Sequence, residues 1–336
     1  MSPGEISGIA VKAITAALPS TIMDTDAFAA IYGEREVARV VRGTGIGSIR
    51  TAAGLGTGDL LVAAASHLLD GLGLNAAEID ALIVVTQTPD DWSPGSAYAV
   101  HHRLGLPTGC HVVDVNGGCA GYVTAMIQAA SLVASGAFRN VLICTGDVNT
   151  RLVDDRDHQV RMLFGDAASA TLVGPGQDRL AFVSGADGSG RESLGVTLRY
   201  QKDGERSGVV GSLHMDGAAV MSFALRRVPE AIDALLDGLR LRRGDIGLFA
   251  LHQPNRFVLD YLRNRLNIPP ERLPFDIDGI GNTNSTSIPL LLARRYGRTG
   301  GAPARVVMCG FGVGLAWGAL LADLSGTRVL APVEVA

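Results

Sequence analysis

The sequence predicts an α/β fold of layered helices and sheets, built from two similar halves. Three observations support this prediction. Short runs rich in β-branched residues alternate with longer helical stretches along the chain. The strand-like runs are apolar throughout, which is typical of sheets covered by helices on both faces. In addition, a segment of the first half of the chain recurs in the second half.

The repeat consists of Leu-Leu-Asp-Gly-Leu-Gly-Leu at 68–74 and Leu-Leu-Asp-Gly-Leu-Arg-Leu at 235–241. Each copy leads through a polar stretch into an apolar run and then a turn that contains proline. The offset is about half the chain, as expected for a duplicated domain. Chance identity is the alternative, but the matched order of elements favours duplication. We therefore expect two similar halves, 1–176 with a nucleophilic cysteine and 177–336 with its partner residues.

The individual elements follow from periodicity and from turn residues. Strands are expected at 81–85, 111–115, 140–145, 168–173, 248–251, 305–309 and 318–323. Helices are expected at 59–72, 97–104, 119–135, 221–239, 255–266 and 287–296. Residues 185–218 are rich in Gly, Ser and charge and show little periodicity. They are expected to form a long loop, such as a lid over a tunnel.

Composition excludes several classes of protein. The chain of 336 residues is 47% hydrophobic and 18% charged, which indicates a globular protein rather than a disordered one. A net charge of −4 provides no basic field for nucleic acid or an anionic membrane. No apolar run approaches the roughly 20 residues of a membrane span, and the N-terminus does not resemble a signal peptide. The four cysteines lack CxxC spacing, so we expect a reduced, cytoplasmic protein without a zinc site.

Cys119 is the strongest candidate for a catalytic residue. It follows an apolar run at 111–115 and the pair Gly117-Gly118, and it stands where a helix is expected to begin. Such a turn exposes a side chain, and a helix N-terminus and a histidine are expected to enrich the thiolate at neutral pH. A buried structural cysteine is the alternative. The other cysteines lie in or beside apolar strands and fit that alternative.

Two later segments supply partners for a nucleophilic cysteine. His252 directly follows an apolar strand and is suited to bind a thioester carbonyl oxygen, although it could simply cap the strand end. Asn282 offers an amide donor that needs no particular protonation state. The residues of Gly281–Ser285 are also typical of an ordinary turn, and Asn284 is an alternative to Asn282 as the amide donor. Together these residues suggest a Cys-His-Asn site for acyl transfer.

The chain resembles the ketoacyl-ACP synthase III group of condensing enzymes in the thiolase superfamily. The resemblance spans nearly the whole chain. It rests on motifs in the family's order: Thr44-Gly45-Ile46 with Arg50, Asp114–Tyr122, Phe164-Gly165-Asp166-Ala167-Ala168, His252-Gln253-Pro254-Asn255, Gly281-Asn282-Thr283, and Gly310–Gly318. It implies a five-layered αβαβα thiolase fold built from two duplicated halves, a homodimer, and no metal or redox cofactor.

The resemblance also implies roles for individual residues. Cys119 would carry the acyl group, while His252 and Asn282 would stabilise the enolate formed when the second substrate loses carbon dioxide. The backbone N–H groups of Cys119 and Val313 would form the oxyanion hole, although the family commonly has glycine at the position of Val313. Phe311 would pack beside the cysteine and favour decarboxylation.

The sequence departs from the family at the coenzyme A contacts. The segment Tyr32–Ala38 lacks the tryptophan that stacks on adenine in primary-metabolic members, and His158 replaces a second contacting arginine. We therefore expect acyl thioesters on acyl carrier protein rather than on coenzyme A, and a role in polyketide-type, fatty-acid-type or related secondary metabolism. Arg256 and Arg263, with Arg265, are candidates for docking an acidic carrier protein. A solvated helix face is the alternative.

The segment Asp91-Trp92-Ser93-Pro94 lies where the family's dimer-interface loop reaches toward the acyl pocket of the partner subunit, and the small Ser93 suggests room for a longer or branched acyl chain. Two rival functions remain open. The acyl group on Cys119 could pass to an alcohol or amine without carbon–carbon bond formation. Alternatively, the chain could be an inactive partner subunit of another ketosynthase, although the intact Cys-His-Asn set argues against that role.

Overall fold

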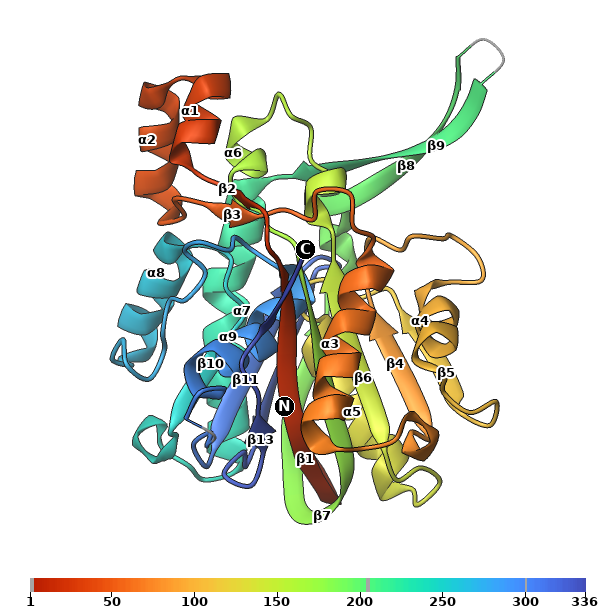
Figure 1. Cartoon of the computed structure of the whole chain (residues 1–336). Helices are drawn as coiled ribbons and strands as arrows, with labels where there is room; N and C mark the ends of the chain where they lie inside the picture. The colour runs from red at the N-terminus through yellow and green to blue at the C-terminus, as the bar shows by residue number, and fades with distance from the viewer. Residues whose placement is uncertain (1–2, 204–205, 300) are drawn as a thin grey trace.

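Helices and strands alternate along the chain in the computed structural model, which describes residues 3–203, 206–299 and 301–336 (Figure 1). The strands are β1 (Gly4–Pro19), β2 (Ile22–Met23), β3 (Ile49–Arg50), β4 (Ala81–Val85), β5 (His111–Val115), β6 (Val141–Asp147), β7 (Ala167–Ala186), β8 (Leu194–Asp203), β9 (Arg206–Met215), β10 (Leu248–Leu251), β11 (Val306–Gly312), β12 (Ala316–Ala322), β13 (Arg328–Val329) and β14 (Val333–Val335). The helices are α1 (Thr25–Tyr32), α2 (Glu34–Thr44), α3 (Thr57–Leu72), α4 (Ser96–Leu104), α5 (Gly121–Ala134), α6 (His158–Arg161), α7 (Gly217–Gly238), α8 (Arg256–Leu266) and α9 (Ser287–Tyr296).

The long strand β7 connects the two groups of strands. The order of hydrogen-bonded strands is β10-β11-β12-β7-β6-β4-β5, and β1 pairs with β7. Residues 167–173 of β7 pair with β6, and residues 181–186 pair with β12. The expected boundary between residues 176 and 177 therefore falls where β7 changes its partner. The duplication itself stays a prediction.

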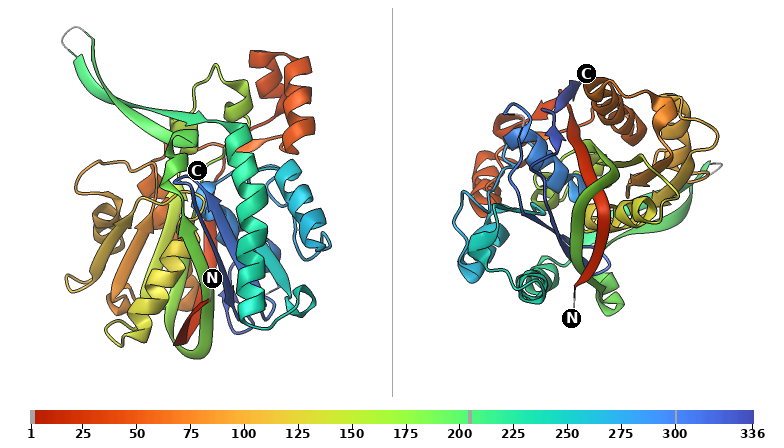
Figure 2. Two further views of the ribbon diagram at one scale, coloured as in Figure 1. Left: turned by 180° about the vertical axis from the view of Figure 1, so that it is seen from behind. Right: turned by 90° about the horizontal axis from the view of Figure 1, so that it is seen from below.

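Strand side chains alternate between two helical layers. In β4, Ile83 and Val85 face the cluster formed with α5 and α9, whereas Leu82 and Val84 face α3 and α4. The strands on the other side repeat this arrangement, because Met308 of β11 faces α5 and α9 while Val307 faces α7 and α8. Helices α5 and α9 thus form a central layer between the two parts of this sheet, and further helices cover the outer face of each part (Figure 2). The predicted five-layered α/β architecture is confirmed.

Several segments differ from the prediction. Residues 194–203 and 206–215 form the paired antiparallel strands of the β8–β9 hairpin, which projects from the body of the molecule (Figures 1 and 2). The expectation of an irregular loop over 185–218 is therefore wrong, because antiparallel pairing satisfies backbone groups without strong side-chain periodicity. The N-terminal strand β1, which pairs along β7, was not among the predicted strands. The predicted helix after Cys119 is present but begins at Gly121.

A close backbone contact joins two motifs that lie far apart in the sequence. Phe164 and Asn282 form an isolated parallel bridge, in which the Asn282 N–H donates to Leu163 O at 2.8 Å and the Gly165 N–H donates to Asn282 O at 3.0 Å. A Cβ atom on Gly165 would overlap the Ile280 carbonyl oxygen. Glycine at residue 165 therefore permits the bridge that positions Asn282.

Replacing Gly165 with alanine should destabilise the protein by at least about 2 kcal/mol, because the added methyl group has no space beside the Ile280 carbonyl. We expect thermal unfolding to show a midpoint lower by several degrees. The matched control is Gly109→Ala, because a Cβ atom there meets nothing within 4 Å. Equal unfolding midpoints for the two variants would contradict this interpretation.

Candidate active site

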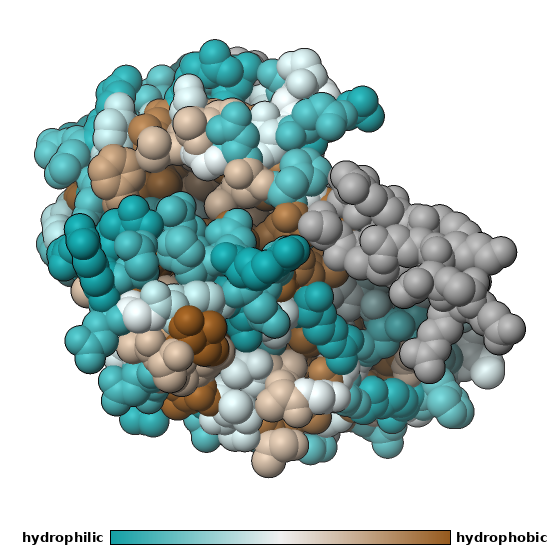
Figure 3. Space-filling model, turned by 90° about the horizontal axis from the view of Figure 1, so that it is seen from above, coloured by the Kyte–Doolittle hydropathy of each residue, from teal (hydrophilic) through white to brown (hydrophobic). Residues whose placement is uncertain are grey.

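Cys119, His252 and Asn282 line one cavity of about 150 Å³. Apolar side chains from several elements complete its wall, among them Phe164, Met221 and Val258. Leu194 and Met215, at the base of the β8–β9 hairpin, also line it. Figure 3 views the molecule from above, where hydrophobic residues lie in hollows between hydrophilic ones. The structure therefore brings the three sequence-predicted residues together in a largely apolar enclosure.

Glycines position Cys119 in the turn before α5. The Gly121 N–H donates to Gly118 O at 2.7 Å, which places Cys119 in the turn that starts the helix. The strand β11 lies directly on this turn, because a Cβ atom on Gly312 would be 2.9 Å from Cys119 Sγ. A Cβ atom on Gly118 would overlap Val313. The cysteine is consequently held between its own turn and the backbone of β11.

Burial controls the protonation of Cys119. Its side chain is buried, and desolvation together with the nearby Asp147 carboxylate raises the pKa of the thiol to about 12. The backbone N–H groups of Cys119 and Val313 bond the sulfur and lower the pKa, but by less than burial raises it. The expectation of an enriched thiolate at neutral pH is therefore wrong for the site without substrate. The thiol is protonated at rest.

His252 directly follows β10, as predicted, and its backbone N–H donates to the Cys309 carbonyl oxygen at 2.8 Å. Burial lowers the pKa of its imidazole to about 3, so the ring is neutral over the physiological range. Its Nδ1 lies 2.8 Å from Ser287 Oγ. The Ser287 hydroxyl donates to the Asn284 carbonyl oxygen at 2.9 Å, so Nδ1–H is the donor to Ser287. Nε2 is then the unprotonated nitrogen at rest.

The amide of Asn282 has a fixed orientation. Its Oδ1 accepts a hydrogen bond from the Asn284 N–H at 3.0 Å, which leaves Nδ2 available to a ligand in the cavity. Phe311 also lines the cavity, and its ring packs edge-on against His252 with centroids 5.3 Å apart. Asn282 and His252 can therefore serve as neighbouring polar groups in an apolar wall.

Two further amides belong to the site although the sequence did not assign them roles. Asn284, the alternative to Asn282, lines the cavity and accepts a hydrogen bond from the Cys119 thiol, with 3.6 Å between Sγ and Oδ1. Asn149, which follows β6, lines the cavity and accepts a bond from Asn284 Nδ2 at 2.6 Å. The only sequence signal for Asn149 is a polar residue shortly after a buried strand.

The candidate docking arginines differ in their surroundings. Arg256 is exposed at the start of α8, with its guanidinium 4.3 Å from the centroid of the Phe275 ring. The Arg263 side chain is only 13% exposed, and it bonds Leu273 O and Asp260. We therefore leave Arg263 out of the docking surface and retain Arg256.

The structure also bears on metals and membranes. Among the described residues, no group of three or more His, Cys, Asp or Glu side chains is arranged to hold a metal ion. Within the same part of the chain, no helix is both long enough and apolar enough to span a lipid bilayer.

Comparisons with known proteins identify the family. Residues 113–188 match the model of 3-oxoacyl-[acyl-carrier-protein] synthase III, and residues 236–324 match the model of its C-terminal region. The beta-ketoacyl-[acyl-carrier-protein] synthase III of Rhodopirellula baltica is 34% identical, with 95% of this chain and 99% of the relative covered. The matched regions include Cys119 in the first model and both His252 and Asn282 in the second.

Solved structures agree over the whole chain. A 3-oxoacyl-(acyl-carrier protein) synthase from Burkholderia xenovorans has a TM-score of 0.92 at 31% identity, with 99% of each chain covered. The priming beta-ketosynthase of the R1128 polyketide pathway has a TM-score of 0.85 at 30% identity, with 96% of this chain and 98% of the other covered. These similarities confirm the thiolase fold. The chain belongs to the 3-oxoacyl-[acyl-carrier-protein] synthase III family, whose members are condensing acyltransferases.

Proposed function

We propose that this protein carries an acyl group on Cys119 and condenses it with a malonyl- or β-ketoacyl-carrier-protein acceptor. The observation that carries the proposal is the meeting of Cys119, His252 and Asn282 in one buried cavity. A covalent acyl-cysteine divides the reaction into two easier steps. The polyketide priming ketosynthase among the structural relatives supports a role in secondary metabolism.

In the loading step, the Cys119 sulfur attacks the donor carbonyl carbon and the carbon–sulfur bond of the donor breaks. The thiol proton passes through the unprotonated Nε2 of His252 to the departing thiol. The backbone N–H groups of Cys119 and Val313 approach the sulfur and would bind the oxygen of the tetrahedral intermediate. Val313 supplies its N–H despite its side chain, because Gly118 leaves space for the valine.

In the condensation step, a malonyl acceptor loses carbon dioxide and the resulting enolate attacks the acyl carbon. The free Nδ2 of Asn282 would donate to the enolate oxygen. For His252 to donate as well, Nε2 must carry a hydrogen. Turning the Ser287 hydroxyl hydrogen from the Asn284 carbonyl to Nδ1 would allow this tautomer and preserve the His252–Ser287 bond. The carbon–sulfur bond to Cys119 then breaks, and the departing thiolate takes up a proton from solvent.

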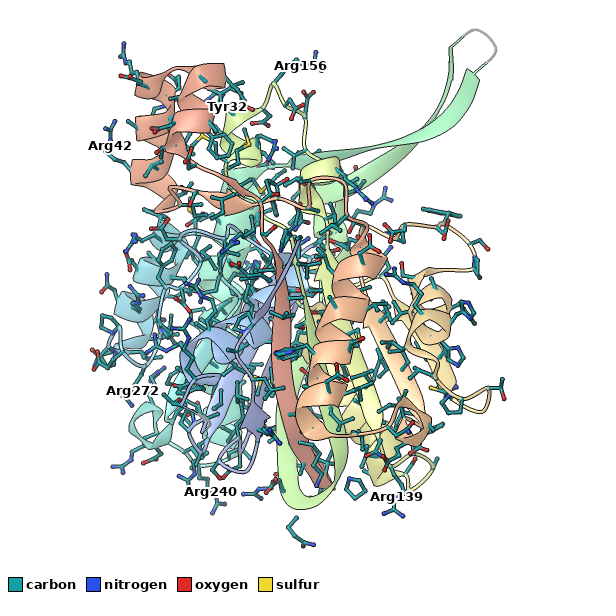
Figure 4. All side chains as sticks on the ribbon, in the orientation of Figure 1. Tyr32, Arg42, Arg139, Arg156, Arg240 and Arg272 are labelled. Atoms are coloured by element: carbon teal, nitrogen blue, oxygen red, sulfur yellow. The ribbon has the colours of Figure 1, made fainter. Side chains whose placement is uncertain are left out.

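The surroundings of His158 support a carrier-protein donor. The resemblance places a coenzyme A contact at this position. Here the imidazole Nε2 lies 3.5 Å from Glu36 Oε2 and 3.4 Å from Arg39, and the ring packs 5.9 Å from that of Tyr32. Tyr32 lies at the upper end of the molecule (Figure 4). Side chains of this protein thus surround His158, and no tryptophan is present there to stack on adenine.

Carrier-protein thioesters should acylate Cys119 faster than the matching coenzyme A esters. Intact mass spectrometry of the wild type and of Cys119→Ala, each incubated with a panel of both donor classes, identifies the nucleophile. The same spectra report the preferred acyl chain length and the preferred class of donor. Equal or faster labelling by coenzyme A esters would overturn the donor assignment. Failure of every thioester to label Cys119 would instead favour the inactive partner subunit.

Wild-type protein should release carbon dioxide from malonyl-carrier protein once Cys119 is acylated. Asn282→Ala should lower that release by about 100-fold or more, because it removes a donor to the enolate oxygen. Acylation of Cys119 should change little, because the loading step does not use that donor. Acyl transfer to an alcohol or amine without carbon dioxide release would establish the rival acyltransferase function.

Arg256 supports docking of an acidic carrier protein beside the cavity. Its neighbours Asn255 and Val258 line the cavity, so Arg256 stands at the rim. The same helix exposes Phe257, Tyr261 and Arg265. A basic group beside exposed aromatic side chains is suited to an acidic partner that delivers a thioester into the cavity.

Arg256→Glu should raise the KM for acyl-carrier protein by about 10-fold and leave kcat nearly unchanged, because it reverses a charge at the rim. Arg139→Glu is the matched control, since Arg139 lies at the lower end of the molecule (Figure 4). Steady-state kinetics with carrier protein at two salt concentrations measure the effect. Equal KM values for the two variants would exclude Arg256 from docking.

We also propose that the protein is a homodimer that pairs through β5 and its neighbouring loops. Strand β5 lies at the edge of the sheet order, and Trp92 and Tyr98 nearby are 79% and 53% exposed. An open cavity of about 900 Å³ borders Trp92 and shares Gln87 and Val313 with the Cys119 cavity. A second subunit there would cover the exposed aromatic residues and enclose space for a longer acyl chain.

A further inference from the structure

Asn284 contacts or connects to each of the three proposed catalytic residues. Its side chain accepts the hydrogen bond from the Cys119 thiol. Its backbone N–H donates to Asn282 Oδ1, and its carbonyl oxygen accepts from Ser287, which in turn bonds His252. The residue has φ = 48°, in the left-handed region that asparagine adopts more readily than most residues.

The direction of the Asn284 amide is fixed by a chain of hydrogen bonds. Asn149 Nδ2 donates to the Gly165 carbonyl oxygen at 2.9 Å, so Asn149 Oδ1 must face Asn284. Asn284 Nδ2 donates to that oxygen, so Asn284 Oδ1 must face Cys119. Rotating either amide by half a turn would place two oxygens against each other. The backbone at Gly165 therefore determines that Cys119 meets an acceptor rather than a donor.

An acceptor at this position favours the thiol over the thiolate. Asn284, Asn149 and Cys119 are 7%, 5% and 6% exposed, so water competes little for these bonds. In such surroundings a carbonyl-type oxygen attracts S–H and repels S⁻. Two titratable groups lie near the sulfur. Asp147 is two residues before Asn149 in the sequence, and His252 lines the same cavity. Burial raises the pKa of Asp147 to about 7, and the Asn284 side chain is among the groups that offset part of that rise. Asp147 is therefore partly charged near neutral pH, and its charge disfavours the thiolate.

We propose that Asn284 is a positioning residue that holds Cys119 protonated and oriented until a thioester enters, and that Asn149 sets the direction of its amide. The inference rests on the proposed role of Cys119 as nucleophile. It adds that the resting thiol is protected from general electrophiles by a specific hydrogen bond and not by burial alone. Entry of a thioester would displace this bond and bring the backbone donors of Cys119 and Val313 into use.

The test is the pH dependence of Cys119 alkylation by iodoacetamide, followed by peptide mass spectrometry. Asn284→Gly removes the amide and retains the left-handed backbone with its bonds to Asn282 and Ser287. We expect alkylation of Cys119 at pH 7 to be about 10-fold faster in this variant, because the thiolate reacts and its fraction increases. Cys144 and Cys309, which are fully buried, are internal controls and should stay unlabelled.

Asn149→Ala provides a second variant and should shift the profile in the same direction by a smaller amount, because the Asn284 amide is then free to rotate. An unchanged or slower Cys119 alkylation in a folded Asn284→Gly protein would overturn the proposal. If that variant does not fold, an unchanged profile in Asn149→Ala would overturn it. Because alkylation requires no acyl donor, these outcomes are distinct from a failure of Cys119 to accept an acyl group.

Discussion

The site depends on the direct contact between the backbone of β11 and the turn that carries Cys119. A Cβ atom on Gly310 would lie 2.6 Å from the Cys119 carbonyl oxygen, and one on Gly312 would lie 2.8 Å from Cys119 Cβ. Only glycine permits two chain segments to approach this closely. Since β10 pairs with β11, and His252 bonds Cys309 of β11, the same strand also fixes the distance from the cysteine to the histidine.

This packing excludes water from the site, and the exclusion determines the charge states. The thiol and the imidazole are both neutral at rest, because burial penalises the charged form of each. Hydrogen bonds are stronger and orphaned polar groups are more costly in such surroundings. The orientation of each amide therefore has direct chemical consequences. Asn282 presents donors to a ligand, whereas Asn284 presents an oxygen to the thiol.

The sequence could single out Cys119, His252 and Asn282 as candidates, because each follows a local signal, namely a glycine turn or the end of an apolar strand. The contacts of Asn149 and Asn284 beside Cys119 could not be predicted, since they depend on the meeting of β6, the Phe164–Gly165 segment and the loop before α9. For the same reason, the burial of Arg263 could not be predicted from its position in the helix. The hairpin β8–β9 was missed because its strands pair mainly with each other and leave little apolar periodicity.

The continuity of β7 limits how substrates reach Cys119. One strand is hydrogen-bonded to β6 in its first part and to β12 in its last part, and β1 runs beside it through both. A hinge motion between the two parts of the molecule would break many of these backbone hydrogen bonds together. The free-energy cost of such an opening is therefore prohibitive. For the proposed role of Cys119, access would come from small displacements of surface segments, such as the hairpin base at Leu194 and Met215 that lines the cavity. Turnover would then be governed by local loop motion on a rigid frame.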